Sequence, residues 1–311
     1  MRIRTPSRIH VTLIDMNATI GRVDGGVGFA INEPFIEIKA FESEKVVVEG
    51  KSSNLERFER VAKKFETRFG KGIEIKVISD YKSHIGLGSG TQISLAIGKA
   101  YCALYGIELS IRQIAEITGR GGTSGIGVAV FEHGGFVVDG GHRWEEKKSF
   151  MPSSASKAKP APLISRLDFP NWDVVVVVPE LSGAYGSGEI ELFQKSCPVP
   201  IEEVRELCHL ILMKLLPSLV ENDLDSFNFA ISRIHELGFK KAEVERYGSL
   251  IRQLIDSMPV GLSSTGPSVY AVTDANAKSL AREISGYFAE KGLKCEKIIT
   301  KGRNRGAEIE V

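Results

Sequence analysis

The sequence predicts an α+β protein of two domains, and three observations support this. Strand-like segments around a glycine-rich turn fill the first fifty residues, a strand leads through a glycine loop into a helix near residue 90, and a strand–helix–strand pattern ends the chain. A chain of 311 residues is long enough for two domains, and 42% hydrophobic residues suffice for a substantial core. We expect the domains to be 1–160 and 161–311, because residues 149–165 are rich in Ser, Ala, Lys and Pro and lack periodicity.

In the first half, apolar residues that recur every three or four positions indicate helices, and alternation indicates strands. The helix expected after residue 110 has the clearest ends, since Ser110 and Gln113 form a capping box and Gly119 provides the stop. The other expected elements are strands within 2–14, 35–48 and 73–77 and helices over 55–69 and 91–104.

The second half opens with a buried strand over 173–178, whose valines are too few to span a bilayer. Apolar periodicity then predicts three helices, within 204–215, 224–234 and 244–254. The end of the chain predicts a split βαβ arrangement on a small sheet: a strand over 269–272, a helix over 277–288 and a strand over 295–299.

The charges nearly balance, since 40 Lys and Arg face 39 Asp and Glu for a net charge of +1. This argues against nucleic acid as a partner and leaves room for a local cationic pocket that binds an anionic small molecule. The N-terminal MRIRTPSRIH lacks the apolar stretch of a signal peptide, so we expect a cytoplasmic protein with no membrane segment. The four cysteines form no CxxC pair; we expect reduced thiols, with Cys102, Cys208 and Cys295 buried.

The loop GLGSGT at 86–91 sits between an expected strand and an expected helix. Unpaired backbone N–H groups and the helix dipole attract phosphate there, and glycine lets the anion approach closely. The loop lacks the Lys-Ser/Thr pair of a Walker A motif and, with Thr at position 91, the Rossmann spacing. The phosphate-binding candidates are Gly86, Gly88, Ser89, Gly90 and Thr91, and a plain tight turn is the alternative.

Three segments in order resemble the motifs of the GHMP superfamily of small-molecule kinases: PSRIHVTLID at 6–15, GLGSGTQISLAIG at 86–98 and GLSSTGPSVYAV at 261–272. A fourth segment, at 119–141, lies where those kinases carry a Ser-Gly-Ile-Asp type run, but here Gly127 replaces the acid. Within the superfamily the chain resembles the archaeal β-ribofuranosylaminobenzene 5'-phosphate synthases more closely, in the segments RIHVTLIDMN, GRVDGGVGFA and GTSGIG.

That resemblance implies a GHMP-kinase-like fold, with a ribosomal-protein-S5-like N-terminal domain and a ferredoxin-like C-terminal domain. It implies a transferase of methanopterin biosynthesis that condenses 4-aminobenzoate with 5-phosphoribosyl 1-diphosphate to give β-ribofuranosylaminobenzene 5'-phosphate, carbon dioxide and pyrophosphate. It also implies Mg²⁺ beside the diphosphate, and a homodimer. A ring carbon would be the nucleophile, so a base in place of Gly127 would have no hydroxyl proton to accept.

Such a reaction needs donors for the departing diphosphate and negative charge near the cationic ribose carbon. His10 lies on an expected strand, and Asp15, Arg22 and Asp24 flank the turn before a glycine pair. We expect Asp15 and Asp24 to hold Mg²⁺ or to steady positive charge, Arg22 to bind phosphate, and His10 to lie in the same site. The alternative is that these side chains are capping, solvated or structural groups.

Further candidates lie along the rest of the chain. They are Gly121, Gly122, Thr123 and Ser124 as a second anion-binding nest, Ser264, Thr265 and Gly266 as the third motif over the phosphate loop, and Tyr185 and Glu189 as substrate contacts after the valine strand. The spacing of His133, Asp139 and His142 is irregular, so we expect a hairpin with satisfied polar groups there rather than metal ligands.

Two other functions stay open at this point. An ATP-dependent kinase of the GHMP type shares most of the motifs, although Gly127 disfavours it. A non-catalytic protein of the kinase fold that binds a sugar phosphate is compatible with the intact 86–91 loop.

Overall fold

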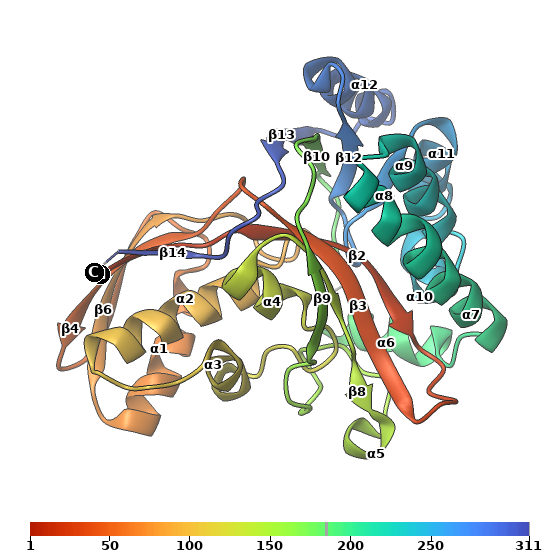
Figure 1. Cartoon of the computed structure of the whole chain (residues 1–311). Coiled ribbons are helices and arrows are strands. Elements are labelled where there is room, and N and C mark those ends of the chain that lie inside the picture. The colour runs from red at the N-terminus through yellow and green to blue at the C-terminus, as the bar shows by residue number, and fades with distance from the viewer. Residues whose placement is uncertain (184–185, 311) are drawn as a thin grey trace.

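The computed structural model describes residues 1–183 and 186–310. Figure 1 shows its sheets with the helices that pack on them. One sheet has the order β14 (Glu308–Glu310), β1 (Arg2–Arg4), β4 (Glu37–Ser43), β6 (Gly72–Ser79) and β5 (Val46–Gly50). A second has the order β2 (Ser7–Asp15), β3 (Arg22–Ile31), β7 (Phe136–Asp139) and β9 (Leu163–Leu167), with β8 (His142–Arg143) paired to β3.

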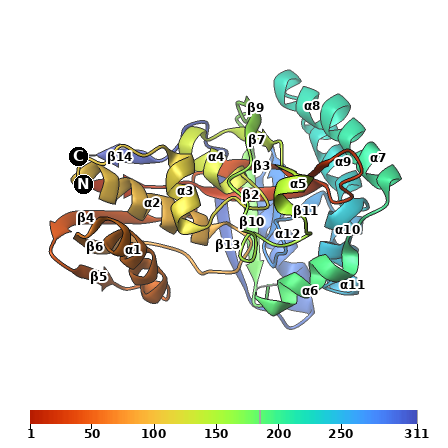
Figure 2. The ribbon, with the colours of Figure 1, turned by 90° about the horizontal axis from the view of Figure 1, so that it is seen from below.

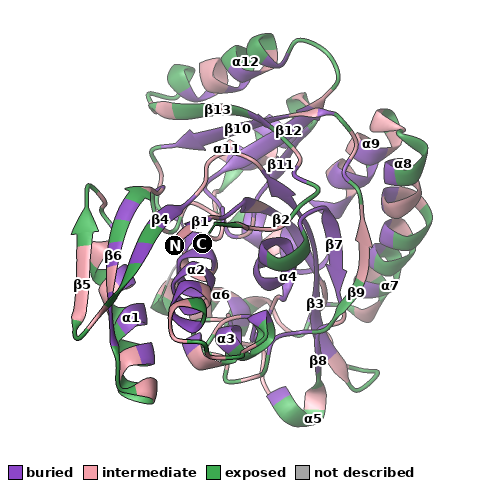
Figure 3. Ribbon diagram, turned by 60° about the vertical axis from the view of Figure 1, so that its left-hand side comes forward, coloured by how far each residue is buried: buried purple, intermediate pink, exposed green. Residues whose placement is uncertain are grey.

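Helices cover one side of these sheets, because their apolar stripes need a partner surface. The helices α1 (Leu55–Phe69) and α2 (Ser89–Leu104) pack on the first sheet, and α4 (Ile126–His133) packs on the second. The helices α2 and α4 also contact each other and lie in the buried centre of the molecule in Figure 3. They are joined by α3 (Ile111–Thr118) and followed by the short α5 (Trp144–Lys147).

The second half contains the predicted split βαβ arrangement, which is confirmed. Its antiparallel sheet has the order β11 (Val260–Leu262), β12 (Val269–Thr273), β10 (Asp173–Pro179) and β13 (Cys295–Lys301), and α12 (Ala277–Glu290) packs on β10 and β13. Between β10 and β11 lie α6 (Ser187–Ser196), α7 (Ile201–Leu210), the π-helix η1 (Ile211–Leu215), α8 (Leu216–Glu221), α9 (Leu224–Ile234), α10 (Gly238–Glu245) and α11 (Ser249–Ser257).

Local signals predicted the helix ends well where capping chemistry was present. Ser110 Oγ accepts from Gln113 N at 3.2 Å, and Gln113 Oε1 accepts from Ser110 N at 2.8 Å. The single helix expected over 244–254 is wrong, because Gly248 has a φ of 58° and separates α10 from α11. The apolar spacing continues across this break since both helices bury the same side in one cluster.

The cysteine prediction is correct for Cys102, which is buried, and all four cysteines are free thiols. It is wrong for Cys208, which is exposed because it lies away from the buried side of α7, and Cys295 is only half-buried.

The two halves share a core. Phe29 on β3 stacks on Phe169 with ring centroids 4.5 Å apart and meets Phe227 of α9 and Tyr270 of β12 edge-on. The chain end returns to the first sheet, where β14 pairs with β1, and Figure 2 shows the termini side by side. The boundary expected near residue 160 stays a prediction; beyond it, β9 still pairs with β7.

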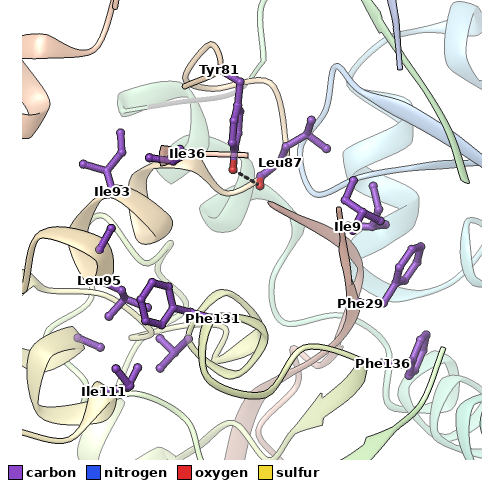
Figure 4. Packing of buried hydrophobic residues seen from close by; sticks show 14 of the residues in the cluster. Ile9, Phe29, Ile36, Tyr81, Leu87, Ile93, Leu95, Ile111, Phe131 and Phe136 are labelled. Atoms are coloured by element: carbon purple, nitrogen blue, oxygen red, sulfur yellow. Dashed lines mark hydrogen bonds between the residues drawn. The ribbon is translucent and has the colours of Figure 1, made fainter. Parts of the chain in front are cut away.

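The core also supports the glycine loop from below. Tyr81 is buried, and its hydroxyl donates to Leu87 O at 3.1 Å, the bond drawn in Figure 4. Leu87 itself is fully buried among the surrounding aliphatic side chains. Apolar packing and the hydrogen bond from Tyr81 therefore hold this side of the glycine loop. Throughout residues 1–183 and 186–310, each helix is too short or too polar to cross a bilayer.

Candidate functional site

A cavity of about 210 Å³ lies where three of the sequence motifs meet. Its walls come from β2, the glycine loop before α2, the start of α4 and the turn after β11. Most of the predicted site residues line it: His10, Gly86, Gly88, Ser89, Gly90, Thr91, Thr123, Ser124, Glu189, Ser264, Thr265 and Gly266. Residues from segments more than 200 positions apart are thus brought to one site.

The glycine loop has the geometry of an anion site. Gly88 is the residue before α2, has a φ of 80°, and provides no side-chain cap for the helix. A Cβ on Gly86 would lie 2.4 Å from Ser263 O, and one on Gly88 would lie 2.9 Å from Arg8 Cγ. Glycine is required at both positions, and Ser89 and Gly90 of the uncapped first turn of α2 line the cavity, where the free N–H groups of a helix start favour an anion.

Two arginines that the sequence prediction missed stand beside this turn. A Cβ on Gly90 would lie 2.7 Å from Arg57 Nη1 and 3.4 Å from Arg120 Nη1, so both guanidinium groups flank the helix start. Burial and, to a smaller extent, the neighbouring charge of Arg57 together lower the pKa of Arg120 to about 10. Among the described residues neither arginine has a carboxylate within salt-bridge distance. A bound anion would neutralise this crowded charge.

The first and third motifs are joined directly across the cavity. Ser264 N donates to His10 O at 2.9 Å, and His10 N donates to Ser263 Oγ at 3.1 Å. Ser263 Oγ in turn donates to Gly86 O at 2.8 Å, and Arg8 Nη1 donates to the same carbonyl at 2.8 Å. The third motif therefore fixes the position of the glycine loop, as the resemblance implied.

Two carboxylates also line the cavity, Glu189 of α6 and Glu243 of α10. Glu243 is 3% exposed and forms an ion pair at 2.5 Å with Lys240 Nζ, which also donates to Leu262 O and Ser264 O. Burial and, to a smaller extent, the charge of Glu243 raise the pKa of Glu189 to about 7. The cavity is thus lined by both cationic and acidic side chains.

A hydrogen-bonded chain forms one wall. Ser124 Oγ lies 3.1 Å from His10 Nε2 and donates to Asp139 Oδ2 at 3.4 Å. Gly125 N and Gly141 N donate to the same carboxylate at 2.8 and 2.9 Å, so the polar groups of Asp139 are satisfied as the sequence predicted. Burial lowers the pKa of His10 well below its ordinary value, which keeps the ring neutral.

The predicted site residues Asp15, Arg22 and Asp24 lie outside the cavity lining. Asp15 Oδ1 accepts from Asn17 N and Ala18 N at 2.8 and 2.9 Å, which stabilises the β2–β3 turn. Arg22 Nη2 donates to Gly140 O at 2.6 Å and therefore holds the turn before β8. These are the structural roles that the alternative interpretation described.

Asp24 is 1% exposed and belongs to a buried ion cluster. Its two carboxylate oxygens lie 2.7 and 2.6 Å from Lys147 Nζ, and Oδ2 also lies 2.6 Å from His142 Nδ1. Both oxygens of Asp24 are occupied by a cation and a ring nitrogen, so Asp24 does not fit the expected Mg²⁺ ligand, whereas that role of Asp15 stays a prediction. Over the described part of the chain, no group of three or more His, Cys, Asp or Glu side chains is arranged to hold a metal ion.

The predicted second nest is only half open to the cavity. Cβ atoms on Gly121 and Gly122 would meet Pro160 and Ser156 at 2.8 Å, so the segment after α5 covers both glycines. Thr123 and Ser124 do line the cavity, and Thr123 Oγ1 donates to Met151 O at 2.6 Å. Tyr185 lies outside the described residues.

Gly127 faces the cavity on the first turn of α4. A Cβ there would lie 3.1 to 3.3 Å from three side-chain atoms of Thr91. A side chain at this position would therefore be crowded by Thr91, the last residue of the glycine loop, and Gln92 Nε2 fixes the backbone by donating to Gly127 O at 2.9 Å.

Sequence reasoning missed Arg8, Arg57, Arg120 and Glu243. Arg8 and Arg120 had a signal, since Arg8 alternates with His10 on the strand of the first motif and Arg120 lies among the glycines of the 119–141 segment. Arg57 on α1 and Arg120 in the loop after α3 lie 63 positions apart, and only the packing of α1 against α2 and α3 brings them together.

Comparison with known proteins agrees with this geometry. The GHMP kinases N terminal domain matches residues 56–135. A homoserine kinase from Cytophaga hutchinsonii is 14% identical with a TM-score of 0.67, covering 99% of this chain and 97% of that chain. A mevalonate kinase from Methanococcus jannaschii is 15% identical with a TM-score of 0.64, covering 98% of both chains. The predicted two-domain GHMP-kinase-like fold is confirmed.

Much closer relatives exist among curated proteins. The β-ribofuranosylphenol 5'-phosphate synthase of Archaeoglobus fulgidus is 65% identical over the full length of both chains. The protein of the same name from Methanocaldococcus jannaschii is 43% identical over 99% of this chain and 100% of its own. The resemblance noted in the motifs thus extends over the whole sequence, and the chain belongs to the β-ribofuranosylphenol 5'-phosphate synthase family.

Proposed function

We propose that this protein is a transferase that joins 5-phosphoribosyl 1-diphosphate to a 4-substituted benzoate and releases carbon dioxide and pyrophosphate. The motif resemblance implies 4-aminobenzoate as the acceptor and β-ribofuranosylaminobenzene 5'-phosphate as the product. The name of the relatives contains a phenol. The same reaction would give that phenol product if 4-hydroxybenzoate were the acceptor. The observation that carries the proposal is the cavity itself, which combines arginines beside the glycine loop, two carboxylates and no acid at Gly127.

The bond changes match the charges of the cavity. The ring carbon that bears the carboxylate attacks C1 of the ribose, and the bond from C1 to the diphosphate oxygen breaks with its electron pair on pyrophosphate. The ring then loses carbon dioxide, and the electron pair of that bond restores its aromaticity. Arg57, Arg120 and the start of α2 favour the diphosphate end, because charge accumulates there as the bond breaks.

The carboxylates of the cavity suit the opposite charge. As the diphosphate leaves, the ribose carbon gains positive charge, and Glu189 and Glu243 are the carboxylates that line the cavity. Leu13, Pro152 and Phe193 line the same cavity and offer apolar surface for an aromatic ring. Mg²⁺ as a companion of the diphosphate, a role in methanopterin biosynthesis, a cytoplasmic location and a homodimer remain parts of the proposal.

The direct test uses acceptor labelled in its carboxyl carbon. The folded protein is incubated with 5-phosphoribosyl 1-diphosphate, Mg²⁺ and labelled 4-aminobenzoate or 4-hydroxybenzoate, and labelled carbon dioxide is trapped. We expect release with at least one acceptor. ADP formation from ATP and a small alcohol would instead identify a kinase, and stabilisation by the sugar diphosphate without turnover would identify a binding protein.

A further inference from the structure

The hydrogen bond between the side chains of Ser124 and Asp139 connects the cavity with a buried carboxylate that does not line it. Ser124 and His10 line the cavity, whereas Asp139 is 1% exposed and lies behind them. Ser124 Oγ is 3.4 Å from Asp139 Oδ2 and 3.1 Å from His10 Nε2. The serine hydroxyl is therefore the link between the cavity and the buried carboxylate.

The backbone is shaped to bring these groups together. A Cβ on Gly26 of β3 would lie 2.8 Å from both Asp139 Oδ2 and Ser124 Oγ, so any other residue would collide with the two linked atoms at once. Two backbone N–H groups, of Gly125 and Gly141, hold the carboxylate from the other sides. The arrangement is rigid, and it leaves Ser124 Oγ as the group that meets a ligand.

A carboxylate directly behind Ser124 disfavours phosphate at this wall, because two anions would share one hydroxyl. It suits a neutral hydroxyl that can give up a proton. In the proposed reaction the two acceptors differ here: an amino group already donates electrons to the para carbon in its neutral form, whereas a phenol becomes a strong carbon nucleophile only as its phenolate.

We propose that Ser124 binds the para hydroxyl of a 4-hydroxybenzoate acceptor and passes its proton to Asp139, while His10 holds the serine in place. In the tautomer with hydrogen on Nε2, His10 donates to Ser124 Oγ, which also accepts from Ile126 N at 3.3 Å. The phenol takes the place of this long contact from Ile126 N, and the serine keeps its own hydrogen for Asp139. This inference rests on the proposed function and names the acceptor and the residues that select it.

The protons balance over one turnover. As the ring carbon attacks C1 of the ribose, the phenol proton moves through Ser124 to Asp139, and the ring becomes a dienone. Loss of carbon dioxide returns the electron pair to the ring as a phenolate. The same proton then moves back from Asp139 through Ser124, so no further acid or base is consumed.

The surroundings of Asp139 support this role. Burial raises the pKa of Asp139 to about 7, against the lowering effect of its two backbone hydrogen bonds. That value includes two smaller effects: the charge of Asp24 raises the pKa of Asp139, and the charge of His142 lowers it. Lys147 and His10 are the other titratable groups nearby. A base with a pKa near the working pH transfers protons most effectively in both directions.

The test compares the two acceptors in one variant. Ser124→Ala should lower kcat on 4-hydroxybenzoate by about a hundredfold or more, the range for loss of acid–base assistance, and should lower kcat on 4-aminobenzoate much less. Ser154→Ala is the matched control, because this serine also lines the cavity but bonds to Glu189 instead, and it should leave the ratio between acceptors unchanged. Equal loss on both acceptors in Ser124→Ala would overturn the proposal.

A second measurement needs no variant. In the wild-type enzyme, ionisation of Glu189 should raise kcat on both acceptors with pH up to about 7, and kcat on 4-hydroxybenzoate should rise more steeply because Asp139 must lose its proton as well. Identical pH profiles for the two acceptors would contradict the relay. Failure of the proposed function is distinguishable, since the wild-type enzyme would then release no carbon dioxide from either acceptor.

Discussion

At the scale of single residues, half-buried arginines without a carboxylate partner among the described residues mark the site better than the motif glycines do. Arg57 and Arg120 crowd the start of α2, and the described carboxylates lie too far away to neutralise them. The side chains that the sequence singled out for charge, Asp15 and Arg22, instead bind backbone groups of nearby turns. A bound diphosphate would complete the pairing of the two arginines.

Replacement of Arg57 tests that pairing. Arg57→Ala should raise KM for 5-phosphoribosyl 1-diphosphate by roughly ten- to a hundredfold, the value of a charge-assisted hydrogen bond, in steady-state kinetics. Arg60→Ala is the control, because Arg60 lies on the same helix but is exposed and outside the cavity lining. A similar rise in both variants would mean that only the general positive potential matters.

Gly127 offers a second test at this scale. Gly127→Asp restores the acid of the kinases, yet its Cβ would press on Thr91 at 3.1 to 3.3 Å. We expect this variant to lose transferase activity and to gain no ATP-dependent kinase activity, because the added side chain displaces Thr91 from the glycine loop. ADP formation by the variant with a small alcohol would show that the cavity is still organised as a kinase site.

At the scale of elements, a buried ion cluster joins β3, β8 and α5. Lys147 Nζ binds Asp24 and also donates to Thr123 Oγ1 and Met151 O at 3.0 and 3.2 Å, so it holds the segment after α5 against the cavity wall. His142, the other partner of Asp24, bonds to Lys159 O at 2.8 Å through Nε2. Asp24 therefore supports the site through backbone position rather than by contact with a ligand.

Loss of that carboxylate should destabilise the fold. Asp24→Asn leaves Lys147 buried without a counter-charge, which costs about 3–5 kcal/mol of unfolding free energy in urea titration. Glu59→Gln removes an exposed ion pair with Lys63 and should cost less than about 0.5 kcal/mol. If Asp24 were a metal ligand, a chelator would lower the melting temperature of the wild-type protein; we expect no change.

The elements also show what the sequence can reveal. The helix over 111–118 was predictable because Ser110, Gln113 and Gly119 are local signals, and the glycine loop because its residues are consecutive. The break at Gly248 was hidden by an apolar pattern that continues across it. The pairing of Lys147 with Asp24 spans 123 positions, and no local pattern reports such a contact.

At the scale of the whole molecule, the halves share one aromatic cluster. Phe227 of α9 is fully buried and touches Phe29, Phe136, Phe169 and Trp172 from the other elements of the core. The site likewise takes residues from both halves, such as His10, Glu243 and Ser264, so its geometry depends on both halves being folded together.

This predicts one cooperative unfolding transition. Phe227→Ala should lower the stability by about 3–5 kcal/mol and move the whole transition, followed by circular dichroism and by tryptophan fluorescence. Separate shifts of the two signals would indicate domains that unfold independently.

The central claim, carbon–carbon bond formation with loss of carbon dioxide, is tested most directly by measuring two products together. Labelled carbon dioxide from the acceptor carboxyl group and pyrophosphate from 5-phosphoribosyl 1-diphosphate are followed in the same reaction. The account predicts that they appear in equal amounts and only when both substrates are present. Pyrophosphate release without carbon dioxide, by folded protein with both acceptors, would contradict it.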